Sequence, residues 1–131
     1  MKTEDDVRSL EKLIVQLRGM HTEISQLAKR SPNDGLNVFK LRLVNKVLAG
    51  GNELLTGRYK PFEDFGEFDE EALPTNSDVT MILALYMEQT ERLRSDNMVY
   101  SEYKYKWYFV IDGATSQIEG AAPTTIGKDK K

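Results

Sequence analysis

Apolar residues recur every three or four positions along the first thirty residues of the chain. They form a stripe that consists of Leu10, Leu13, Leu17, Met20, Ile24 and Leu27. This heptad-like spacing is typical of a helix that packs against another helix, as in a coiled coil. Thr3 or Asp5 can cap the start of this helix, and Lys29 and Arg30 complement the negative end of its dipole. The pattern therefore predicts a first helix from about Thr3 to Arg30.

A second helix is expected after the turn-forming residues 31–35. It should begin near Leu36 and continue through Leu48 or beyond. Its apolar positions form two adjacent stripes, one of Leu36, Phe39, Leu43 and Val47 and one of Val38, Leu41, Val44 and Leu48. Such broad apolar coverage predicts a central helix. Gly50 and Gly51 predict either a break capped by Asn52 or a close approach between two helices.

The connection from residue 58 to residue 76 is long, acidic and aromatic. Because Phe62, Phe65 and Phe68 would be poorly buried in a free coil, we expect this segment to be ordered and to wrap the helices. The pattern leaves open whether it is a binding site or a packed loop. Asn76 or Ser77 then caps a third predicted helix, which runs to about Asp96.

The period of the pattern changes after Asn97. Tyr103, Tyr105, Trp107, Phe109 and Ile111 alternate with other residues, as is typical of a strand. Asp112 and Gly113 predict a hairpin turn, followed by a short return strand from Ala114 to Ile118. A continued helix over 99–111 is the alternative, because Tyr100, Tyr103, Trp107 and Ile111 also fit helical spacing.

These elements predict a mainly α fold, a helical bundle of three principal helices with a short C-terminal β-strand or hairpin. The domain should span residues 1–119, and residues 120–131 should form a flexible tail. With 131 residues, 40% of them hydrophobic, one core is sufficient, and the absence of cysteine excludes disulfides, thiolate zinc sites and thiol nucleophiles. No signal peptide or membrane-length apolar run is visible, so we expect a cytoplasmic protein without membrane contact or cofactor.

Charge is distributed unevenly between the two halves of the chain. Residues 1–60 carry eleven Lys or Arg against seven Asp or Glu, whereas residues 61–131 carry seven against fourteen. A nucleic-acid-binding accessory subunit is therefore one alternative, with contacts from Arg30, Lys40, Arg42, Lys46, Lys104 and Lys106. Three helices and an aromatic hairpin also resemble a winged-helix domain, with residues 103–118 as the wing. This chain departs from that pattern in its long second connection and its weakly basic third helix.

Two pairs of carboxylates provide the only candidate for catalysis. On helices, Glu67/Glu70 and Glu88/Glu91 would each place two carboxylates on one face. This arrangement slightly resembles the all-α nucleoside triphosphate pyrophosphohydrolases, which bind Mg²⁺ through paired acidic motifs on neighbouring helices. The resemblance implies an Mg²⁺-dependent enzyme with Glu88 and Glu91 as metal ligands. The chain departs from it because no acidic pair follows Glu91, and the only histidine, His21, has no supporting catalytic motif.

Protein association explains most of the pattern. A helix of nearly thirty residues can use its apolar stripe to bind a second copy of the chain. We therefore expect a non-catalytic interaction or assembly subunit that forms a homodimer through Leu10, Leu13, Leu17, Met20, Ile24 and Leu27. The open edges of the predicted hairpin also favour pairing with another chain.

Overall fold

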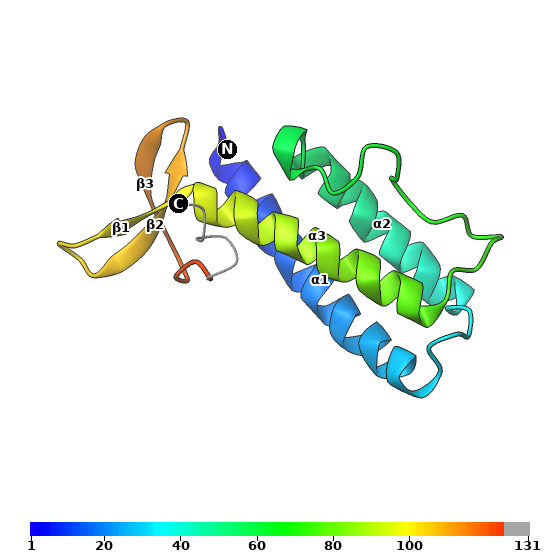
Figure 1. The fold of residues 1–131 in the computed structure, drawn as a ribbon. Coiled ribbons are helices and arrows are strands. Elements are labelled where there is room, and N and C mark those ends of the chain that lie inside the picture. The colour runs from blue at the N-terminus through cyan, green and yellow to red at the C-terminus, as the bar shows by residue number, and fades with distance from the viewer. Residues whose placement is uncertain (125–131) are drawn as a thin grey trace.

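The computed structural model describes residues 1–124 and shows three helices followed by a three-stranded antiparallel sheet (Figure 1). The elements are α1 (Glu4–Arg30), α2 (Val38–Leu54), a short 3₁₀ helix η1 (Gly57–Tyr59), α3 (Asn76–Asp96), β1 (Met98–Ser101), β2 (Lys106–Ile111) and β3 (Ala114–Gly120). The expectation of a mainly α fold with a C-terminal β element is confirmed, although there are two consecutive hairpins instead of one. No helix within residues 1–124 combines the length and apolar character needed to cross a membrane.

Two helices begin with the same reciprocal cap. In α1 the Thr3 hydroxyl accepts a hydrogen bond from Asp6 N, and the Asp6 carboxylate accepts one from Thr3 N. Thr75 and Asp78 repeat this arrangement in α3, so the predicted cap at Asn76 or Ser77 was wrong. Asn76 is instead buried, where its Nδ2 donates to the Ser31 carbonyl at 2.9 Å.

The second helix runs without interruption through its two glycines. It begins at Val38, capped by Asn37, and ends at Leu54. A Cβ on Gly51 would lie 3.4 Å from the Tyr86 ring and 3.7 Å from Leu13 Cδ1, which are ordinary contact distances, so Gly51 lies beside side chains of both α3 and α1. The Tyr86 hydroxyl donates to Asn52 Oδ1 at 2.7 Å beside it. Of the two expectations for this position, the break is wrong because the helix is continuous, and the close approach between two helices stays a prediction.

The three helices share one core. It contains leucine, isoleucine and valine side chains from all three helices, together with Tyr86 from α3. Of the two apolar stripes predicted on α2, only part is buried, because Val38, Phe39 and Leu43 are exposed. The three helices and the Phe-rich loop described next are called the helical body below.

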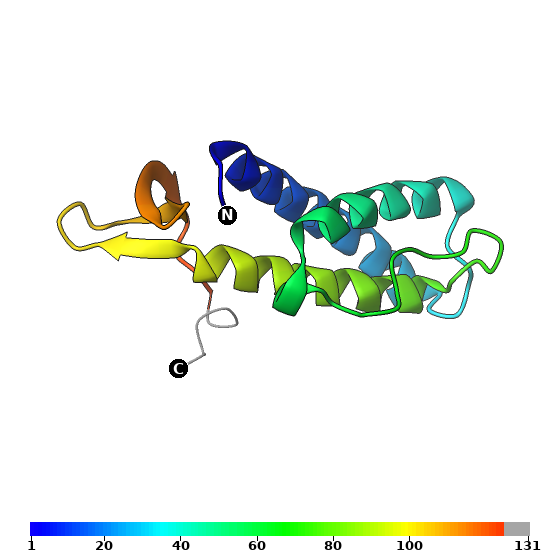
Figure 2. The same cartoon turned by 90° about the horizontal axis from the view of Figure 1, so that it is seen from above.

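The Phe-rich loop (residues 60–75) lies along the helices as predicted (Figure 2). Its rings contact one another edge to face, with centroid distances of 6.0 Å for Phe62 and Phe65 and 5.1 Å for Phe65 and Phe68. Asn45 of α2 fixes the loop by donating to the Phe68 carbonyl and accepting from Phe68 N, both at 2.9 Å. These contacts identify the loop as a packed element of the fold.

The sheet begins immediately after α3 and extends away from the helices (Figures 1 and 2). Its base has a small separate core, in which Met98 and Phe109 cover Val7 of α1. Asp112 and Gly113 form the predicted turn, with φ values of 53° and 82°. The predicted continuous strand over 103–111 is partly wrong, because residues 102–105 form a turn between β1 and β2.

The predicted tail from residue 120 is also only partly described. Gly120 belongs to β3, and the Ala121 and Ala122 carbonyls accept hydrogen bonds from the buried guanidinium of Arg94. Thr124 N donates to the Glu91 carboxylate at 2.8 Å. Residues 125–131 lie outside the described part of the chain.

Candidate functional site

The apolar stripe of α1 lies inside the chain's own core. Leu10, Leu13, Leu17 and Ile24 are buried, and Met20 and Leu27 pack against the same cluster. Their partners are apolar side chains of α2 and α3. In this conformation, the six residues predicted as a subunit interface therefore expose little surface to a second chain.

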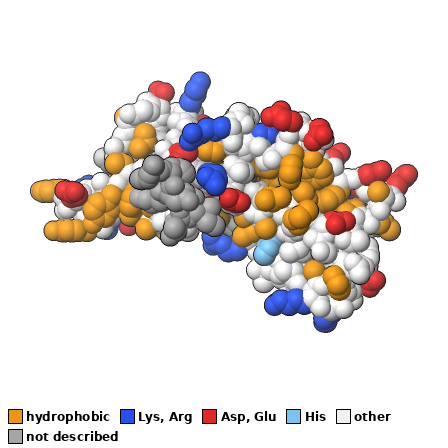
Figure 3. All heavy atoms as spheres, in the orientation of Figure 1, with side chains coloured by type: hydrophobic (Ala, Val, Ile, Leu, Met, Phe, Trp, Pro, Cys, Tyr) orange, Lys and Arg blue, Asp and Glu red, His pale blue; other side chains and the backbone are white. Residues whose placement is uncertain are grey.

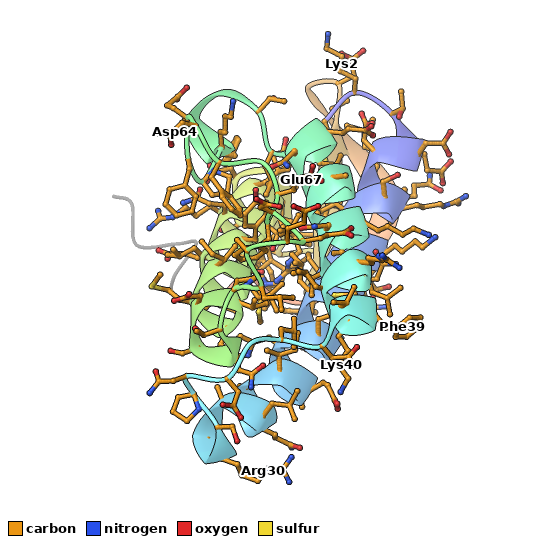
Figure 4. The ribbon with its side chains drawn as sticks, turned by 90° about the vertical axis from the view of Figure 1, so that its right-hand side faces the viewer. Lys2, Arg30, Phe39, Lys40, Asp64 and Glu67 are labelled. Atoms are coloured by element: carbon orange, nitrogen blue, oxygen red, sulfur yellow. The ribbon has the colours of Figure 1, made fainter. Side chains whose placement is uncertain are left out.

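The six basic residues predicted to contact nucleic acid do not form one surface. Arg30 and Lys40 lie at the end of the helical body opposite the sheet (Figure 4), whereas Lys104 and Lys106 belong to the hairpin. Carboxylates already pair with three of the six residues. Lys40 Nζ lies 2.6 Å from Glu23, Arg42 Nε lies 3.1 Å from Glu70, and Lys106 Nζ lies 3.5 Å from Glu119. Lys46 is exposed on α2, between the end of the helical body that carries Arg30 and Lys40 and the hairpin.

Glu88 and Glu91 line a groove of about 330 Å³ between α1 and α3. His21 lies on the same groove and borders a hydrophobic area of the surface (Figure 3). Arg92 pairs with Glu88 at 3.1 Å, and Arg94 donates twice to Glu91, at 2.9 and 3.0 Å. Among residues 1–124, no three histidine or acidic side chains come close enough together to hold a metal ion. The other predicted pair, Glu67 and Glu70, lies in the Phe-rich loop.

The Glu91 carboxylate is held in its charged form by its hydrogen bonds. Burial raises its pKa, but the bonds from Arg94 and from Thr124 N outweigh burial and hold the pKa below its usual value. A carboxylate held in its charged form in this way is typical of a structural ion pair and not of a group that transfers protons. The two carboxylates of the groove are therefore already paired with arginines, and the rest of its lining includes Ile14, Ala84 and Met87.

The two most exposed aromatic side chains of the described residues, Tyr103 and Tyr105, lie at the end of the first hairpin, and both are more exposed than Phe39 of α2 at 68%. We call β1, the turn and β2 the aromatic hairpin (residues 98–111). The exposed fractions are 91% for Tyr103, 79% for Tyr105 and 41% for Tyr100. In Figure 3, hydrophobic side chains gather where this hairpin projects from the rest of the molecule. Exposed aromatic clusters of this kind are typical of binding sites.

One face of the aromatic hairpin continues the small core outward. Met98 pairs with Phe109 and Tyr100 pairs with Trp107 in the antiparallel register. Because side chains two residues apart point to the same face of a strand, all four lie on one face. The inner pair is buried against Val7, and the Tyr100 and Trp107 rings meet at 5.4 Å beyond it. The core thus anchors the base of the hairpin, while the outer rings remain partly accessible.

The hairpin carries charges of both signs near its tip. Glu102 has no ion-pair partner within residues 1–124, and the Lys104 ammonium lies 5.6 Å from the centroid of the Tyr108 ring, with no carboxylate partner in that range. Lys106 is neutralised by Glu119. Within the described residues, Tyr103 therefore has on one side a carboxylate and on the other an ammonium that lack an ion-pair partner.

The turn at the tip has an unfavourable residue in a left-handed conformation. Tyr105 N donates to the Ser101 carbonyl at 2.7 Å, and Lys104 N donates to Ser101 Oγ at 3.2 Å. Tyr105 itself has a φ of 61°, a conformation that costs a residue with a side chain roughly 1–2 kcal/mol. Glycine or asparagine would fit this turn better, so the aromatic ring is present despite a conformational penalty.

Sequence reasoning identified the aromatic segment but missed its exposed tip. Glycine, proline and asparagine, the strongest turn signals, are absent between residues 98 and 111. The alternation of tyrosines with polar residues therefore predicted one strand through the turn.

Comparisons with known proteins found no relative of this chain. No protein-family model matches the chain, and no curated protein and no solved structure is significantly similar to it.

Proposed function

We propose that this chain is a non-catalytic protein-contact subunit that binds its partner through the aromatic hairpin. The observation that carries the proposal is the near-complete exposure of Tyr103 and Tyr105 at the end of an element whose base is buried. Tyrosine and tryptophan dominate the energetically important centres of protein interfaces, because their rigid rings bury a large area at low entropic cost. The hairpin is thus suited to act as an anchor.

The placement of the hairpin supports this role over an interface on α1. The α1 stripe cannot reach a partner without opening the core, whereas the hairpin projects beyond the helices (Figure 1). A contact made there leaves the helical body unchanged. The proposal therefore retains the assembly role expected from the sequence and moves the contact surface to the C-terminal sheet.

The charges of the hairpin favour a protein over a nucleic acid. A strand of phosphates requires unpaired cations beside the stacking rings. Here Glu119 pairs with Lys106, so Lys104 is the one cation of the tip without a carboxylate partner within residues 1–124, and the Glu102 carboxylate, also without an ion-pair partner there, adjoins the most exposed ring. This carboxylate would repel a phosphate chain at the point of closest approach.

Site-specific photo-crosslinking tests the proposal in cells that express the full chain. Tyr103 is replaced by the photoreactive residue p-benzoylphenylalanine, and the same replacement at Val15, which is 65% exposed on α1, serves as the matched control. We expect a defined protein adduct at position 103 that is absent at position 15. The same adducts at both positions, a nucleic-acid adduct at 103, or no adduct at 103 would each contradict the proposal.

A further inference from the structure

We propose that the partner of the aromatic hairpin is a second copy of this chain, and that the two hairpin tips meet across a two-fold axis close to Tyr103. This inference rests on the proposed function of the hairpin and names its partner. Three properties of the tip carry it: its charge pattern, its exposed area and the conformation of Tyr105.

The charge pattern is complementary to itself. Glu102 and Lys104 flank Tyr103, and neither has an ion-pair partner within residues 1–124. Two antiparallel tips related by a two-fold axis at Tyr103 bring Glu102 of each copy toward Lys104 of the other. One symmetric contact thus satisfies four charges, as an interface between identical surfaces requires. Each Lys104 can turn from the Tyr108 ring toward the carboxylate opposite, since its side chain is exposed.

The exposed area determines how strong this contact can be. With roughly 200 Å² for each aromatic side chain, the exposed fractions of Tyr100, Tyr103 and Tyr105 amount to about 400 Å² per copy. A standard interface buries about 800 Å² per partner. The structure therefore fits a weak, concentration-dependent dimer with a dissociation constant above about 1 µM.

The left-handed conformation of Tyr105 is explained by the same contact. A tyrosine at a φ of 61° makes the turn less stable than glycine would in the isolated chain. In the symmetric dimer the Tyr105 ring is buried beside Tyr103 of the other copy. The free energy gained by burying this ring on association offsets the conformational cost of the turn. The pairing thus accounts for a residue that the fold of one chain does not need.

A charge-reversal experiment tests the symmetry of the contact. Glu102→Lys and Lys104→Glu are each made in the full chain, with Glu11→Lys on the exposed surface of α1 as the matched control. Sedimentation equilibrium measures the dissociation constant from about 1 µM to about 1 mM. Each reversal places like charges opposite one another twice, so we expect the homodimer to weaken about tenfold while the control stays unchanged.

The mixture of the two variants gives the decisive result. The Glu102→Lys chain carries two positive charges beside Tyr103, and the Lys104→Glu chain carries two negative charges there. A two-fold axis places position 102 of each chain opposite position 104 of the other, so both contacts in a mixed pair join a lysine to a glutamate. A 1:1 mixture should therefore form heterodimers with close to the wild-type dissociation constant. A mixture that associates no better than either variant alone would overturn the inference, as would a wild-type chain that remains monomeric up to about 1 mM.

The Tyr105→Gly variant separates association from folding. It relaxes the turn and removes one ring, so its thermal midpoint should equal or exceed that of the wild type, while the dimer weakens about fivefold or more. An unchanged dissociation constant would contradict the role of Tyr105 in the contact.

The crosslinking experiment distinguishes a failure of this inference from a failure of the proposed function. An adduct between position 103 and an unrelated protein, with a monomeric wild-type chain, would overturn the second copy as partner and leave the contact role of the hairpin in place. A self-adduct at position 103 would support both.

Discussion

The helical body and the aromatic hairpin place their large apolar side chains in opposite environments. In the helical body, the leucines of α1, the apolar face of α2 and Tyr86 of α3 are buried in one shared core. In the hairpin, only Met98 and Phe109 are buried, and the rings become more exposed toward the tip. The first region buries most of its large apolar side chains within one chain, whereas the second leaves the rings at its tip exposed.

This difference shows how one small chain can separate folding from recognition. A partner that binds the exposed tip contacts none of the residues of the helical core, because the tip lies beyond the small core of Val7, Met98 and Phe109 that joins the hairpin to α1. Exposed rings on a helix of the core would instead couple binding to unfolding. The following predictions test this separation.

The largest effect is expected in the helical core. Leu17→Asp places a carboxylate at a fully buried position, and we expect it to remove at least about 4 kcal/mol of stability and most of the helix content. Val15→Asp, two residues away on the exposed side of the same helix, should change stability by less than about 1 kcal/mol. Circular dichroism during thermal unfolding measures both. A Leu17→Asp chain that keeps its helix content but loses a dimer would restore α1 as the interface.

A smaller and more local effect is expected at the base of the hairpin. A Cβ on Gly120 would lie 2.7 Å from Met98 Cε and 2.8 Å from Phe109 Cε2. Gly120→Ala therefore overpacks the small core and should lower the free energy of unfolding by about 2 kcal/mol. Gly50→Ala meets no atom within 4 Å in α2 and should stabilise the chain by about 0.5–1 kcal/mol. Hydrogen exchange should accelerate in residues 98–120 of the first variant and not in α1 or α3. Equal acceleration in all elements would show that the two regions unfold as one unit.

Local signals in the sequence were sufficient for the three helices, the second hairpin and several boundaries. Thr3 and the apolar period placed α1 within one residue, and the pair Asp112 and Gly113 correctly predicted the second hairpin turn. These features succeed because caps and tight turns depend on a few adjacent residues. Gly51 was ambiguous for the opposite reason, because its effect depends on Tyr86, which is distant in sequence.

The same limit explains why the sequence pointed to the α1 stripe, which lies in the chain's own core, and not to the hairpin tip. The period of the α1 stripe shows that one face is apolar, but it does not show whether α3 or another chain covers that face. The tip of the aromatic hairpin was missed because its turn uses Tyr105 where glycine is usual. The residue that weakens the local signal is also the one for which we infer a role in binding, as expected where function conflicts with local preference.

The smallest effect concerns the ion pair that fixes the chain after β3 to α3. The pKa of Glu91 is lowered in the folded state, so its contribution to stability is fully present above the ordinary value of 4.5 and is lost as the pH falls through the folded-state value. Glu91→Gln should therefore cost about 1 kcal/mol at pH 7 and show a flatter loss of stability in acid. Glu88→Gln is the matched control, because Glu88 pairs with Arg92 on the same helix but is more exposed. Unfolding midpoints between about pH 7 and about pH 3 measure the difference. If the control flattened the acid dependence equally, the buried position of the Glu91 and Arg94 pair would not be the cause, and the connection between sheet and helical body would depend on the small core alone.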